Sequence, residues 1–160
     1  LLKPMVTRNP LELPFGRLLA LDGGAVRVGL AVSDSARRLA VVVGAVPRKP
    51  WSGIKTKLAE WQAQGVVACV VGFPLNMDGT EGPACNAARS LADLIEKECA
   101  LPVLLWDERL TSQQAEAAYF EQRTGRQTRG SKKESVGKVD ANAAVLLLQG
   151  VLDYLSAAPR

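Results

Sequence analysis

The run at residues 66–72, V-V-A-C-V-V-G, constrains the fold most, because it contains no charged side chain. A strand with one side in water alternates apolar and polar residues, so an unbroken apolar run is typical of a strand covered on both faces. A second run, V-L-L-W, occupies residues 103–106, and Pro83 opens a helical pattern between the two. Two buried strands joined through a helix predict a layered α/β fold with a parallel pair.

The N-terminal half predicts a different local arrangement. Apolar runs at residues 17–22, 26–34 and 38–46 are separated by turn residues, Gly23-Gly24 in the first gap, which predicts an antiparallel meander of three strands. Residues 1–16 contain three prolines and no apolar periodicity, so we expect an irregular lead-in without function. Residues 17–156 are then one domain.

Helical spacing completes the secondary structure. The pattern predicts helices at residues 51–64, 83–99, 111–119 and 139–155. In the second helix, Ala87, Leu91, Leu94 and Ile95 are the expected core residues. The element order is βββαβαβαα, which predicts a mixed five-stranded sheet with helices on both faces. Sites in such sheets form at the carboxyl ends of the parallel strands.

The 160 residues contain no histidine, which excludes Ser-His-Asp and Cys-His catalysis and histidine-bound zinc. Neither a P-loop nor a G-x-G-x-x-G motif occurs. The three cysteines lack C-x-x-C spacing, and no apolar run is long enough to cross a membrane. We therefore expect a cytoplasmic protein that makes no membrane contact.

The net charge of +4 favours a polyanionic partner, and much of the positive charge is concentrated in one stretch. That stretch contains a single acid, Glu134, and the basic residues Arg123, Arg126, Arg129, Lys132, Lys133 and Lys138. It predicts an arm that binds nucleic-acid phosphates. A solvated charged loop is the alternative.

Three acids occupy positions next to apolar segments, where burying an unpaired charge is energetically unfavourable. Asp22 ends an apolar strand, Glu108 follows another strand, and Asp140 shares one helical stripe with Ala144 and Leu147. Each acid also has a simpler explanation. Asp22 can be an ordinary turn residue, Glu108 can pair with the neighbouring arginine, and Asp140 can be an aspartate favoured at the start of a helix. Without histidine, three oxygen ligands suit Mg²⁺ or Mn²⁺. Two such ions would support phosphodiester hydrolysis.

Four motifs resemble the YqgF/RuvX family of Holliday junction resolvase-like proteins and pre-16S rRNA nucleases. In order along the chain they are L-D-G-G-A-V-R-V-G-L-A-V-S-D at 21–34, V-V-G-F-P-L-N-M-D-G-T-E-G at 70–82, L-P-V-L-L-W-D-E-R-L-T-S at 101–112 and V-D-A-N-A-A-V-L-L-L-Q at 139–149. The resemblance implies a ribonuclease-H-like fold. It also implies a metal-binding triad, which falls motif by motif on Asp22, Glu108 and Asp140.

The first motif departs from the family pattern D-x-G-T-[KR]-R-[IV]-G. Ala25 and Val26 stand where the pattern has threonine and a basic residue. A hydroxyl and a charge near the first strand are therefore missing. We expect the acids to be retained and the efficiency or substrate preference to be altered.

Three further residues are candidates for binding nucleic acid. Arg27 and Arg109 lie next to the proposed acids, where a guanidinium can bind phosphate through two hydrogen bonds. Neutralisation of a nearby carboxylate is the alternative for both. Asn76 begins a segment that can present backbone N–H groups to phosphate before a helix, with ordinary turn and capping chemistry as the alternative.

The sequence thus predicts a metal-dependent nuclease that cuts structured RNA, such as precursor 16S rRNA at its 5′ end, or branched DNA. The alternative is a nucleic-acid or transcription-associated binding module that has the fold without catalysis. An ATPase of the actin and sugar-kinase type would need a second domain. A junction-cutting enzyme would profit from a homodimer, whereas a monomer suffices to trim one RNA end.

Overall fold

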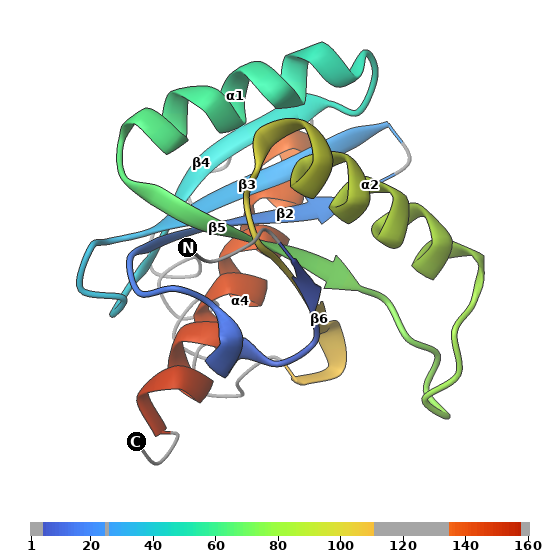
Figure 1. Ribbon diagram of the computed structural model, residues 1–160. Coiled ribbons are helices and arrows are strands. Elements are labelled where there is room, and N and C mark those ends of the chain that lie inside the picture. Colours follow the sequence, from blue (N-terminus) through green and yellow to red (C-terminus); the bar gives the residue numbers. More distant parts are fainter. Residues whose placement is uncertain (1–4, 25, 111–134, 158–160) are drawn as a thin grey trace.

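The computed structural model describes residues 5–24, 26–110 and 135–157, with the backbone alone at 110 and 135–141. Its centre is a six-stranded mixed sheet of order β1-β6-β5-β2-β3-β4 (Figure 1). The strands are β1 (Val6–Thr7), β2 (Arg17–Gly23), β3 (Arg27–Ser33), β4 (Ala40–Pro47), β5 (Val66–Phe73) and β6 (Val103–Asp107). Strand β3 runs antiparallel to β2 and β4, and the other neighbouring pairs are parallel.

Two helical layers cover the sheet (Figure 1). Helices α1 (Trp51–Ala63) and α2 (Pro83–Cys99) lie on one face, and α4 (Ser135–Ala157) lies on the other. Successive residues of β2 point to opposite layers: Leu19 and Leu21 belong to the core under α1 and α2, whereas Leu18 and Ala20 pack toward α4. This alternation explains why the central strands are apolar at every position.

The predicted α/β fold, the antiparallel meander and the two buried parallel strands are confirmed. Strand β5 is almost fully buried and pairs with β2 and β6 in parallel. Helix α2 begins at Pro83 and ends at Cys99 as predicted, and α4 begins at Ser135, four residues before the predicted start. The helix predicted at 111–119 lies outside the described residues.

The predicted strand number of five is wrong, because a short strand forms within residues 1–16. Strand β1 pairs with β6 through Val6 and Thr7, opposite Val103 and Leu104. The Val103 N–H donates to the Met5 carbonyl over 2.7 Å. Two residues are too few to show apolar alternation, so this strand depends on a partner distant in sequence.

The predicted inward face of α2 is wrong at two positions. The buried residues are Cys85, Ala88, Leu91, Ala92 and Ile95. Ala87 is exposed, because it faces a surface cleft rather than the core. Leu94 is 36% exposed, on the solvent side of the same helix.

Helix α4 places Ala144 and Leu147 in the core, as its stripe predicts. Tyr154, on the same stripe, remains partly exposed and rests edge-on against Trp106, with ring centroids 5.4 Å apart. None of the helices in the described ranges is long and apolar enough to span a membrane.

Candidate active site

Two acids meet at one edge of the sheet. Asp22 lies near the end of β2, and Glu108 opens the short 3₁₀ helix η2 (Glu108–Leu110) directly after β6. Strand β5 runs between them, parallel to both, so all three strands end at the same edge. The carboxyl ends of parallel strands thus bring together residues separated by more than eighty positions.

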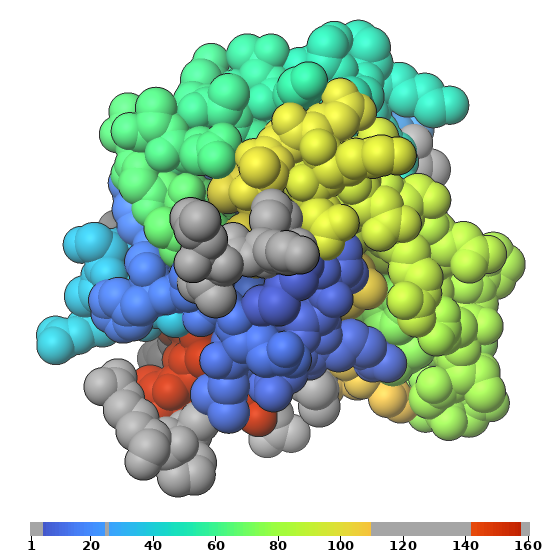
Figure 2. All heavy atoms as spheres, in the orientation of Figure 1, coloured from blue at the N-terminus to red at the C-terminus, as the bar shows by residue number. Residues whose placement is uncertain are grey.

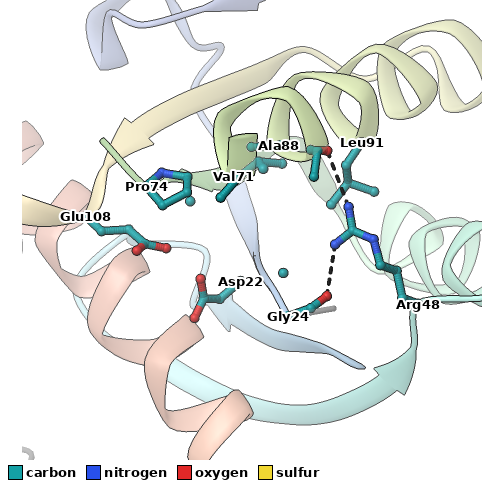
Figure 3. Close-up of a pocket in the computed structure, with 12 residues that line it drawn as sticks. Asp22, Gly24, Arg48, Val71, Pro74, Ala88, Leu91 and Glu108 are labelled. Atoms are coloured by element: carbon teal, nitrogen blue, oxygen red, sulfur yellow. Dashed lines mark hydrogen bonds between the residues drawn. The ribbon is translucent and has the colours of Figure 1, made fainter. Parts of the chain in front are cut away.

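A glycine on the middle strand makes room for both acids. A Cβ at Gly72 would lie 2.5 Å from Glu108 Oε1 and 3.0 Å from Asp22 Oδ1, closer than real side chains tolerate. Figure 3 shows the carboxyl groups of Asp22 and Glu108 turned toward one another. Glycine in a central strand commonly marks such a close approach.

The electrostatics of the pair are unfavourable in the absence of a cation. Burial of the carboxyl group, a hydrogen bond to Asp22 and repulsion by its charge raise the pKa of Glu108 to about 8. Glu108 is exposed as a whole residue, so the cause is local to its carboxyl end, which rests against Gly72 and Asp22. A divalent cation between the two carboxylates would remove this repulsion.

The acids line one end of a cleft of about 460 Å³. Strands β2 and β5 form its floor, and α2 forms one wall (Figure 3). Its lining combines the two carboxylates, one arginine and a set of small or apolar residues. The members are Asp22, Gly23, Gly24, Arg48, Val71, Gly72, Pro74, Ala84, Ala87, Ala88, Leu91 and Glu108.

Asp22 and Glu108 fit a hard divalent cation, since both offer carboxylate oxygens and these oxygens converge over Gly72. Among the described side chains, no group of three acids, histidines or cysteines gathers around one point. The third predicted ligand, Asp140, lies on α4, which packs against β2. The Asp140 side chain itself is outside the described residues.

Arg109, one of the residues predicted to bind phosphate, forms an ion pair with an acid, which is the alternative that the sequence left open. Its Nη2 lies 2.8 Å from Asp107 Oδ2, and its Nη1 donates to the Met77 carbonyl. The hydrogen bond from Arg109 lowers the pKa of Asp107. Arg109 therefore joins η2 to the loop after β5.

Asn76 and Arg27, also predicted to bind nucleic acid, are not among the described residues that line the cleft. Asn76 closes a turn, with its backbone N–H on the Thr80 carbonyl and its side chain on the Thr80 hydroxyl. Arg27 is exposed at the start of β3. The side chains of the basic stretch are outside the described residues: Arg123, Arg126, Arg129, Lys132, Lys133 and Lys138.

Two cleft residues were missed by the sequence reasoning. Gly72 interrupts the apolar β5 near its end, and an isolated glycine in a strand is a signal that could have found it. Arg48 follows β4 in V-P-R-K-P, and nothing local distinguishes it from Lys49. Its place becomes evident once β4 is paired with β3 and α2 lies beside the turn.

Comparison with known proteins shows the family of the chain. The family model RuvX, described as Holliday junction resolvase, matches residues 16–154. A protein of Novosphingobium aromaticivorans named "Putative pre-16S rRNA nuclease" is 37% identical over 158 residues, covering 95% of this chain and 97% of its own. A relative of the same name from Acidiphilium cryptum is 43% identical over 141 residues, covering 88% of this chain and 85% of its own.

A solved structure shares the fold. T. thermophilus RuvC in complex with Holliday junction substrate superposes with a TM-score of 0.50 at 16% identity, covering 88% of this chain and 95% of that one. At this identity the likeness shows the ribonuclease-H-like fold alone, whereas the family match rests on sequence across nearly the whole chain. The chain therefore belongs to the RuvX family of nucleases and has the ribonuclease-H-like fold.

Proposed function

We propose that this protein is a divalent-metal-dependent nuclease that hydrolyses phosphodiester bonds in structured nucleic acid. The observation that carries the proposal is the convergence of Asp22 and Glu108 over Gly72, at the edge of the sheet where parallel strands end. Asp140 supplies the third carboxylate from α4. The metal is Mg²⁺ or Mn²⁺, because the ligands are oxygen atoms and the chain has no histidine.

Each acid has a definite task in this mechanism. Asp22, near the end of β2, and Glu108, directly after β6, would hold the cation, and the β2–β5 and β5–β6 ladders fix their relative position. Burial of the carboxyl group, and after it the neighbouring Asp22, raises the pKa of Glu108, so a cation would bind to the pair in competition with the proton on Glu108. When bound, the metal would activate a water and stabilise the leaving oxygen during in-line displacement.

The relatives suggest the substrate class. Those named above carry the name of pre-16S rRNA nucleases, and the RuvC structure contains a Holliday junction. We propose 5′-end processing of precursor 16S rRNA, cutting of four-way junctions, or both, with Arg123 to Lys138 as a phosphate-binding arm.

Cys69, Cys85 and Cys99 are free, which suits a cytoplasmic site of action. A homodimer would serve junction cutting.

The test is cutting of a labelled four-way DNA junction and of precursor 16S rRNA, with Mg²⁺ or Mn²⁺. We expect the unmodified protein to cut at least one substrate and the Asp22→Asn variant to cut neither at a comparable rate. Asp93→Asn, an exposed aspartate on α2, is the matched control and should cut normally. Binding of both substrates without any cutting would contradict the proposal and favour a non-catalytic binding module.

A further inference from the structure

Arg48 lies in the same cleft as the acids but comes from a different element. It follows Pro47 at the end of β4, and its backbone N–H donates to the Val26 carbonyl over 2.8 Å. Its side chain reaches across the β2–β3 turn, with Nη1 3.0 Å from the Gly24 carbonyl oxygen. Figure 3 shows the guanidinium between this turn and α2, away from the carboxyl groups of Asp22 and Glu108.

A second glycine accommodates the guanidinium. A Cβ at Gly23 would lie 2.8 Å from Arg48 Nη1, so any other residue there would displace the arginine. Gly72 plays the same part for the two carboxylates. The cleft therefore has two positions at which a missing Cβ lets charged groups approach the sheet, one for the negative pair and one for the positive group.

Among the described side chains, no acid forms an ion pair with Arg48. In the described part of the chain, its side-chain contacts are two carbonyl oxygens, those of Gly24 and Ala87. Arg89 and Arg109, by contrast, each bind a carboxylate at 2.9 and 2.8 Å. A guanidinium has five N–H donors, so Arg48 retains donors and a full positive charge for an anion in the cleft.

A purely structural role for Arg48 explains less. A brace between the turn and α2 would need a firm contact at both ends, yet the Nη2 to Ala87 oxygen distance is 3.4 Å. That is at the weak limit of a hydrogen bond. The guanidinium is thus anchored on the turn and only loosely held on the helix.

The cleft wall beside Arg48 consists of small and apolar side chains. Helix α2 lines it with Ala84, Ala87, Ala88 and Leu91, which lie on one helical face at spacings of three and four. The three alanines carry no atom beyond Cβ, so the wall is flat and apolar. Such a wall can pack against a sugar while phosphates on either side meet the charged groups.

We propose that Arg48 binds the substrate phosphate adjacent to the one that is cut, and so positions the strand along the α2 wall. The proposal rests on the proposed function, since Asp22 and Glu108 mark where cutting occurs. A phosphate bound at Arg48 by two hydrogen bonds would fix the direction of the strand as well as its position. It would also add one ionic contact to binding.

The first test measures binding in EDTA, where a metal-dependent nuclease does not cut. The probe is a fluorescent four-way DNA junction, titrated at several salt concentrations with the unmodified protein and with Arg48→Gln, Arg48→Lys and Arg38→Gln. Arg38 is an exposed arginine at the other end of β4 and controls for the lost charge. We expect Arg48→Gln to weaken binding about tenfold and to reduce the salt slope by about 0.9.

Arg48→Lys should keep the salt slope and part of the affinity, because it retains the charge but not the paired donors. Arg38→Gln should bind like the unmodified protein. Two results would overturn the proposal: equal effects of Arg48→Gln and Arg38→Gln, or a lowered melting temperature in Arg48→Gln with unchanged affinity per folded molecule. The latter would assign Arg48 a structural role.

The second test locates the phosphate. Junctions carrying a single neutral methylphosphonate at successive positions around the cut site are cut with Mg²⁺ present. At the position next to the cut, the methylphosphonate should slow cutting by the unmodified protein but not slow Arg48→Gln any further. If the methylphosphonate and the Arg48→Gln change lower the cutting rate additively at every position, the assignment is refuted. If no protein cuts while Arg48-dependent binding persists, the proposed function fails and the phosphate contact stands.

Discussion

Gly72 determines how closely the two carboxyl groups approach one another. In Gly72→Ala, the new Cβ would have to displace Glu108 Oε1 from 2.5 Å and Asp22 Oδ1 from 3.0 Å. We expect Mn²⁺ affinity, measured by calorimetry, to fall about tenfold or more, because loss of the groups that orient metal ligands typically lowers metal affinity by that factor. The strand should remain folded.

Gly53→Ala is the matched control for that substitution. A Cβ at Gly53 meets nothing within 4 Å, and the residue lies inside α1. This change should raise the free energy of unfolding by about 0.5–1 kcal/mol and leave Mn²⁺ affinity unaltered. Unchanged affinity in Gly72→Ala would mean that the carboxylates bind no common ion.

The titration of Glu108 gives the pH dependence. The folded protein keeps a proton on Glu108 up to about pH 8, whereas the ordinary value is 4.5, so the metal-free protein should lose stability as the pH rises between these values. Apparent Mn²⁺ affinity should rise over the same window, because the cation displaces the proton. Above pH 8 both trends should level off.

Asp22→Asn isolates the cause of that shift. Removing the neighbouring charge should lower the pKa of Glu108, while burial keeps it above the ordinary value. Carboxyl carbon NMR of the metal-free protein measures this directly, with Asp93→Asn as a control that should change nothing. An unchanged pKa in Asp22→Asn would show that the two acids do not interact.

At the residue scale, the sequence could identify the acids but not their neighbours. Asp22 and Glu108 are conspicuous because each follows an apolar strand, where a charge needs a reason. Arg48 is conspicuous only after β4 pairs with β3, since its role depends on a turn and a helix that are distant in sequence. For Arg109 the sequence left two roles open, phosphate binding and neutralisation of a nearby carboxylate, and the structure shows an ion pair with Asp107.

At the element scale, β1 and the 3₁₀ helix η1 (Pro10–Glu12) secure the outer side of β6. The Thr7 hydroxyl donates to Glu12 Oε1 over 2.7 Å and accepts the Asn9 N–H. Thr7→Ala should lower the free energy of unfolding by about 1–2 kcal/mol in urea, because a buried hydroxyl and its partners lose their bonds. Mn²⁺ affinity should be unchanged, as Thr7 is distant from the cleft lining.

Thr56→Ala provides the comparison for Thr7→Ala. The Thr56 hydroxyl bonds the Ser52 carbonyl on the exposed side of α1, where alanine is the better helix former. Its removal should be neutral or slightly stabilising. If Thr7→Ala and Thr56→Ala changed the free energy of unfolding by the same amount, the Thr7 hydrogen bonds at β1 would add nothing to the stability of the sheet.

Elements with strong local signals were predictable, and elements formed by pairing were not. Pro83 sets the start of α2 by its own backbone chemistry, so the helix was found from the sequence. The two residues of β1 have no such signal and become a strand only beside Val103 and Leu104. Ala87 was assigned to the core because periodicity cannot distinguish a core face from the wall of a cleft.

At the scale of the whole molecule, one sheet and its helices bring the residues of the candidate site together. The ladders of β2, β5 and β6 carry Asp22, Gly72 and Glu108 to one edge, while α2 and β4 add the wall and Arg48. In the described part of the chain, the cleft lies at this edge, lined by residues of β2, β5 and α2. The family match spans the same elements, from residue 16 to residue 154.

The most direct test of the central claim is the rate at which the protein cuts a four-way DNA junction and precursor 16S rRNA as Mn²⁺ is titrated. We compare the unmodified protein, Glu108→Gln and the exposed control Glu60→Gln. The rate of the unmodified protein and of Glu60→Gln should saturate with Mn²⁺ and vanish in EDTA, and Glu108→Gln should be slower by about a hundredfold or more. Full cutting in EDTA, or equal rates for Glu108→Gln and Glu60→Gln, would contradict a metal-dependent nuclease centred on these carboxylates.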